Sequence, residues 1–129
     1  MTRVSVEVPA ELVRPIRETV LLLYEATAES LHLALKARAL DEVRLHRGRL
    51  EELDEALRAL EPDEQATELH ATRDLIHDAL YGALIDAGER LAEASTRSWR
   101  GELPLERVQA AAEEVLAIDG LLRGLDAAR

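Results

Sequence analysis

Residues 15–40 read PIRETVLLLYEATAESLHLALKARAL, and this stretch decides the fold class. At about 100° per residue, its apolar positions form one long stripe on a helix. Leu22, Leu33 and Leu40 lie off that stripe and form a second ridge about 200° around the helix. A helix that is apolar on two sides is either central in its fold or contacts another chain. We therefore expect these three leucines to be dimer contacts. The predicted core stripe is Ile16, Val20, Leu23, Tyr24, Thr27, Leu31, Ala34 and Leu35.

Helical patterns continue through most of the remaining chain. Residues 10–60 predict two helices that can be continuous, because residues 37–42 contain neither Gly nor Pro. Pro62 and Asp63 mark a break before a helix over 63–100, and Gly101 and Pro104 precede a last helix over 104–126. The sequence thus predicts one all-α domain over 1–129, an antiparallel bundle of three to four long helices with a short N-terminal strand.

Residues 1–9 form the predicted strand or arm. Polar and apolar residues alternate from Arg3 to Val8, and the alternation stops at Pro9. We find no second strand pattern, so the backbone of this strand has no partner within its own chain. Pairing with the same strand of another copy would supply hydrogen-bond partners for these backbone groups. This reasoning predicts a symmetric homodimer in which Val4, Val6 and Val8 make contacts.

Charge limits the classes of partner. The 129 residues carry a formal net charge of −10, which divides unevenly along the chain. Residues 1–50 have eight basic and seven acidic residues, whereas residues 51–129 have eight basic and nineteen acidic residues. An acidic surface repels phosphate backbones, so nucleic-acid binding is disfavoured and any such role falls to the first fifty residues.

Several other classes are disfavoured by composition. The chain has no cysteine, and therefore no disulfide, thiolate metal site or cysteine nucleophile. The longest apolar run, residues 20–24, is far shorter than the roughly 20 residues of a membrane span. No pattern resembling an export signal is present at the N-terminus. We expect a cytoplasmic protein without a membrane segment.

A group of polar residues on the predicted third helix is the strongest candidate for a chemically active site. His70, Asp74, His77 and Tyr81 fall within about 60° of one another on that helix. Asp74 could orient either imidazole for acid/base work or for a pH switch. The same residues also suit the hydrogen-bonded rim of a helix interface, which we favour because no nucleophile accompanies them. We assign no catalytic residue and no cofactor, and we expect a non-enzymatic role.

Two pairs have the carboxylate–imidazole spacing of metal-binding bundles. Glu29 and His32, like Asp74 and His77, lie one helical turn apart, as ligands do in di-iron carboxylate proteins. Such sites need both pairs in the bundle core, whereas Glu29 and His32 fall on a polar strip. A solvated face is the preferred interpretation, so we assign no metal ligand. A metal-binding helical bundle remains an alternative function.

A basic cluster stands out in the acidic chain. It could bind a phosphate or an acidic partner. Glu51, Glu52 and Glu55 follow within one or two helical turns, so ion pairs within the helix are the preferred interpretation. The cluster consists of Arg38, Arg44, His46, Arg47 and Arg49.

The N-terminal segment has one family resemblance. Residues 2–12, TRVSVEVPAEL, resemble the strand-to-helix entry of ribbon-helix-helix DNA-binding proteins, where an alternating strand precedes Pro, an acid and Leu. The resemblance covers about a tenth of the chain. It implies an antiparallel ribbon formed by two copies, with Arg3, Ser5 and Glu7 directed at the major groove.

These observations lead to one main functional hypothesis and two alternatives. The main hypothesis is a small helical oligomerisation or protein-binding module that forms a homodimer and can bind a further protein partner. One alternative is a transcriptional regulator or antitoxin-like DNA-binding protein that uses the N-terminal strand. The other is the metal-binding helical bundle.

Overall fold

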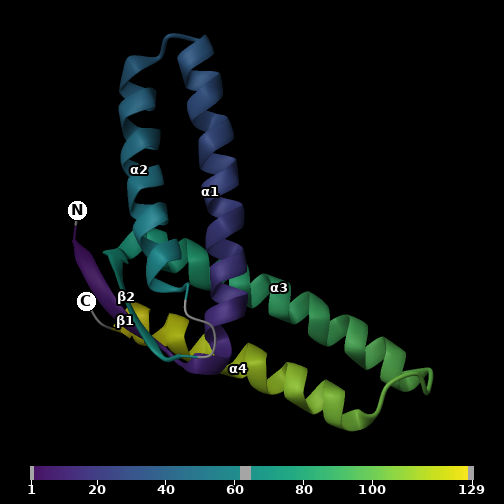
Figure 1. Ribbon diagram of the computed structural model, residues 1–129. Helices are drawn as coiled ribbons and strands as arrows, with labels where there is room; N and C mark the ends of the chain where they lie inside the picture. The colour runs from purple at the N-terminus through teal and green to yellow at the C-terminus, as the bar shows by residue number, and fades with distance from the viewer. Residues whose placement is uncertain (1, 62–64, 128–129) are drawn as a thin grey trace. The chain divides into compact units, whose positions relative to one another are not determined.

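The computed structural model describes residues 2–61 and 65–127. The protein is mostly helical, with four α-helices and one small antiparallel sheet in these residues (Figure 1). Contacts divide the chain into two compact units, residues 1–76 and residues 77–129, which we describe separately. The elements in chain order are β1 (Arg3–Val8), a short 3-10 turn (Ala10–Leu12), α1 (Val13–Lys36), α2 (Leu40–Ala59), β2 (Thr67–Thr72), α3 (Arg73–Trp99) and α4 (Leu105–Ala127).

The N-terminal strand has its partner within the same chain. β1 pairs antiparallel with β2, in a register that runs from Arg3 opposite Thr72 to Val8 opposite Thr67. The expectation of a lone strand is therefore wrong, and so is the expectation that residues 67–72 belong to a helix. This pairing satisfies the backbone groups along one edge of β1 without a second copy.

The sequence of β2 fits both a strand and a helix. Leu69 and Ala71 are buried while Glu68 and His70 are exposed, which is the alternation of a strand. Over only six residues, Leu69 also fits the apolar stripe of a helix that includes Ile76. The tertiary contacts of the strand decide between the two patterns. The expected break at Pro62 and Asp63 lies outside the described residues.

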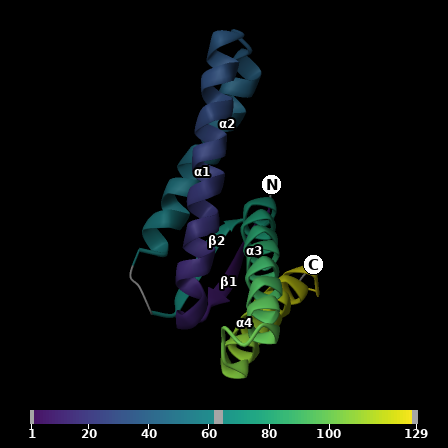
Figure 2. The ribbon, with the colours of Figure 1, turned by 90° about the vertical axis from the view of Figure 1, so that its right-hand side faces the viewer.

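A tight turn separates α1 from α2, so the two helices are not one rod. Arg38 has a positive φ of 57°. The N–H of Ala39 donates to the carbonyl of Ala34 at 3.0 Å, and that of Arg38 donates to Leu35 at 3.2 Å. These bonds form the Schellman arrangement, which ends a helix and usually has Gly at the position of Arg38. Beyond this turn α2 returns alongside α1 as a helical hairpin (Figures 1 and 2).

The core of residues 1–76 lies at the open end of the α1–α2 hairpin, near the sheet. Thr72 Oγ1 donates to Glu52 Oε2 at 2.8 Å and Thr67 Oγ1 donates to the carbonyl of Ala59 at 3.2 Å, so both ends of β2 are tied to α2. Further along α1, away from the sheet, Ala34 is the one buried apolar residue among those described, and Leu35, which was expected in the core stripe, is 54% exposed. The buried apolar side chains of this unit are Val8, Leu12, Val13, Ile16, Val20, Ala34, Leu53, Ala56, Leu60, Leu69, Ala71, Leu75 and Ile76.

Residues 77–129 form a second helical hairpin from α3 and α4. Gly101 has a φ of 76°, and the N–H of Glu102 donates to the carbonyl of Arg97 at 2.9 Å, which is again the Schellman arrangement. An ion pair between Arg90 and Glu114 joins the two helices. No helix within the described residues is both long and apolar enough to cross a membrane. The buried apolar side chains of this unit are Ala79, Leu80, Ala83, Ala87, Ile118, Leu122 and Leu125.

Candidate functional site

The four residues of the predicted polar site lie on two elements: His70 is on β2, whereas Asp74, His77 and Tyr81 are on α3. His70 lies on β2, where it faces Ser5 of β1 and shares a hydrogen bond of 2.8 Å between its Nδ1 and Ser5 Oγ. His77 and Tyr81 lie on α3 with stacked rings, whose centroids are 6.0 Å apart. The helical alignment that placed His70 beside Asp74 does not exist, because His70 is not helical. These residues therefore make two separate contacts, His70 with Ser5 in the sheet and His77 with Tyr81 on α3.

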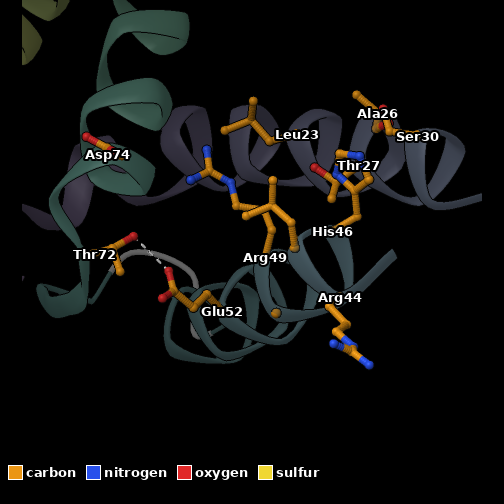
Figure 3. A pocket seen from close by; sticks show the side chains of 12 residues that line it. Leu23, Ala26, Thr27, Ser30, Arg44, His46, Arg49, Glu52, Thr72 and Asp74 are labelled. Atoms are coloured by element: carbon orange, nitrogen blue, oxygen red, sulfur yellow. Dashed lines mark hydrogen bonds between the residues drawn. The ribbon is translucent and has the colours of Figure 1, made fainter. Parts of the chain in front are cut away.

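The predicted basic patch is also dispersed. Arg38 occupies the turn between α1 and α2. Arg47 forms an exposed ion pair with Glu51, with 3.6 Å between Nε and Oε1, one helical turn away. Arg44 and Arg49 both line a pocket, but Figure 3 shows the Arg44 side chain extending away from it. Exposed pairs of this type contribute at most about 0.5 kcal/mol each.

A pocket lies between α1 and α2 within residues 1–76. Its volume is about 600 Å³. Figure 3 shows Leu23, Thr27 and Ser30 on one helix facing His46 and Arg49 on the other. Glu52 on its wall accepts the hydrogen bond of Thr72, drawn as a dashed line. The full lining is Leu23, Ala26, Thr27, Ser30, Arg44, Leu45, His46, Gly48, Arg49, Glu52, Thr72 and Asp74.

This pocket is an open groove that mixes apolar, small and charged side chains. Ala26, Ser30 and Gly48 are small, so they let another segment approach the two helices closely. Arg49 and Glu52 provide both signs of charge. A groove with this lining suits a helix of another chain, which is a common mode of peptide recognition.

In the parts of the chain that the structure describes, the side chains form no cluster of metal ligands. There, no group of three or more His, Asp or Glu side chains could hold a metal ion. Glu29 and His32 are exposed on α1. A single carboxylate and imidazole are too few ligands for a stable site.

The predicted dimer contacts separate into two groups. On β1, Val8 is buried and Val4 and Val6 are half-buried, opposite residues of β2 in the same chain. On the hairpin, Leu22 and Leu33 have 65% and 57% of their surface exposed, and Leu40 is similarly exposed at the start of α2.

A second group of exposed apolar residues was not recognised from the sequence as a contact surface. It lies on α3 and includes Ile85 and Trp99 together with Tyr81, which we had interpreted as part of a polar site. Tyr81 and Ile85 are four residues apart, and Ile85 and Trp99 are fourteen, or two heptads, apart; this heptad-type spacing was the signal that could have identified them.

Comparisons with known proteins do not identify a relative. No family model matches the chain, and the searches of curated proteins and of solved structures found no match.

Proposed function

We propose that this protein is a helical association module, whose α1–α2 groove binds the same hairpin of a second copy. The observation that carries the proposal is the pair Leu22 and Leu33, more than half exposed on a helix that already packs against α2. These two leucines are about three helical turns apart and lie within about 20° of each other around α1. Leu22 and Leu33 do not line the groove themselves; they border it on α1, beside Ala26, which does line it.

The groove has the chemistry expected of a contact between identical surfaces. Leu45 of α2 is exposed on the same side, so apolar side chains come from both helices. Arg49 and Glu52 lie at neighbouring positions, so a two-fold axis can bring Arg49 of one copy toward Glu52 of the other. Two hairpins packed in this way form a four-helix bundle, in which each helix gains a second neighbour.

The expected strength of this contact is moderate. Covering Leu22, Leu33 and Leu45 contributes roughly 1–2 kcal/mol for each side chain, because each is already partly buried. The six side chains of two copies then supply roughly 6–12 kcal/mol, against an association cost of at least about 4 kcal/mol. The net free energy is then at most about 8 kcal/mol, so the expected dissociation constant is about 1 μM at its tightest and about 1 mM when the net gain is about 4 kcal/mol.

Size-exclusion chromatography with light scattering tests the proposal. Leu22→Glu/Leu33→Glu places two charges in the contact and is expected to lower the average mass at a given concentration. The matched control is Leu21→Glu/Leu35→Glu, which alters two exposed leucines on the opposite side of α1 and is expected to keep the wild-type mass. Equal masses for both variants would contradict the proposal, provided that circular dichroism shows the same helix content.

A further inference from the structure

A row of exposed side chains follows one side of α3 within residues 77–129. Tyr81 is 51% exposed, Ile85 is 48% exposed, and Trp99, the only tryptophan of the chain, is 91% exposed. Tryptophan and tyrosine are enriched where protein surfaces meet, because they bury a large area with few rotatable bonds. Three large apolar residues on one side of a helix indicate a contact surface.

The spacing of this row is that of a coiled-coil seam. Successive members are four and three residues apart in alternation, so they stay on one side of the helix. Tyr81 and Trp99 are separated by about five complete turns, which brings them to the same angular position. Large residues occupy the two ends and small residues the middle. The members of the α3 seam are Tyr81, Ile85, Gly88, Ala92, Ser95 and Trp99.

The α3 seam is self-complementary when two copies run in opposite directions. With the copies centred on the middle of the seam, Tyr81 lies opposite Trp99 and Ile85 lies opposite Ser95. Gly88 then lies opposite Ala92 near the axis, where small side chains let the helices approach closely. The aromatic pair forms twice, because the two copies are related by a two-fold axis. A parallel alignment would instead stack Trp99 on Trp99 and leave a gap between the two copies of Gly88.

Charges beside the α3 seam favour the same alignment. Asp78 and Arg100 lie on the same flank of the helix, about 40° apart in angular position. In the antiparallel alignment, Arg100 of each copy lies close to Asp78 of the other, which supplies two attractive pairs. Glu89 lies on this flank, halfway between Asp78 and Arg100. It therefore lies close to Glu89 of the other copy, and these two carboxylates repel each other. The stacking of His77 on Tyr81 holds the tyrosine ring in place for contact.

We propose that α3 is a second self-association surface, which binds α3 of another copy in antiparallel orientation through the α3 seam. This surface shares no residue with the α1–α2 groove. Two different two-fold contacts on one chain can build a closed tetramer, so the inference adds a level of assembly to the proposed function.

Disulfide trapping tests the orientation directly. Because the chain contains no cysteine, introduced cysteines are unique. A Cβ atom at Gly88 meets nothing within 4 Å, so Gly88→Cys fits the chain. We expect a mixture of Gly88→Cys and Ala92→Cys chains to form mixed 88–92 disulfides faster than either chain forms its own. Leu116→Cys, an exposed position on α4, gives the rate of random collision.

The trapping is carried out in the Leu22→Glu/Leu33→Glu background, so that it does not depend on the groove. Faster formation of 88–88 and 92–92 disulfides would show a parallel contact and overturn the proposal. Rates no higher than that of Leu116→Cys would also overturn it. Neither result bears on the α1–α2 groove, which is tested by its own variants.

The fluorescence of Trp99 gives a second, independent measurement. We expect its emission to shift to shorter wavelength as protein concentration rises, because the indole leaves water. Ile85→Glu is expected to weaken this association about tenfold, since it replaces an apolar contact with a charge. Asp78→Arg and Arg100→Asp should each weaken it, and the double variant should restore it. A concentration-independent spectrum, or a double variant no better than the single ones, would overturn the proposal.

Discussion

Glu7 and Glu68 lie directly opposite each other in the β1–β2 register, and both are exposed. Like charges in this position oppose strand pairing. With the two carboxylates about 6 Å apart in a water-like dielectric, their repulsion is about 0.7 kcal/mol, and physiological salt reduces it to about half. Glu68→Thr removes the repulsion and introduces a better strand former. We therefore expect this substitution to stabilise the protein by about 0.5–1 kcal/mol at low salt.

The sign of this effect distinguishes a strand from a helix at residue 68. In a helix that begins near residue 63, as the sequence pattern suggested, Glu68→Thr would lose helix propensity and destabilise the protein by a few tenths of a kcal/mol. Urea denaturation of wild type, Glu7→Thr, Glu68→Thr and the double variant provides a double-mutant cycle. We expect a coupling between the two positions that decreases as salt rises. A destabilised Glu68→Thr protein with no coupling to Glu7 would refute the pairing.

Three further predictions follow from individual residues. Leu53→Ala should destabilise the protein by about 3 kcal/mol in urea denaturation, because Leu53 is fully buried. Leu45→Ala, at an exposed position, should change stability by less than about 0.5 kcal/mol. Similar losses for both variants would contradict the described core. Arg38→Gly should raise stability by about 0.5–1 kcal/mol in the same assay, because Gly adopts a positive φ without strain. A loss of stability would instead indicate a continuous helix through residue 38. Glu89→Gln should tighten α3 association, seen as a shift of the Trp99 emission at lower protein concentration; an unchanged or weaker association would contradict the proposed alignment near the axis.

The helices could be predicted from sequence because their signals are local and long. The apolar stripe from Ile16 to Ala34 spans many turns, so its period is unambiguous. Gly101 and Pro104 bracket the turn between α3 and α4 with the residues that such a turn favours. The turn at Arg38 carries no such residue, and for that reason the sequence left the continuity of α1 and α2 undecided.

The strand β2 and the arrangement of the candidate residues could not be predicted in the same way. Leu69 and Ala71 alternate over too few residues to separate a strand from a helix, and the residues that pair with β1 are about sixty to seventy positions away in the sequence. The expected proximity of His70 to Asp74 depended on both residues lying on one helix, whereas His70 lies on a strand. The seam on α3 was visible in the spacing of Tyr81 and Ile85, but only their exposure in the structure separates a contact surface from a core.

Sedimentation equilibrium of the wild-type protein tests the proposed association most directly. Concentrations from about 1 μM to about 1 mM cover the range in which this contact is expected to form. The proposed function predicts an average mass that rises from that of one chain toward that of two or more chains as concentration increases. The mass of a single chain at every concentration, with the helices intact by circular dichroism, would contradict it.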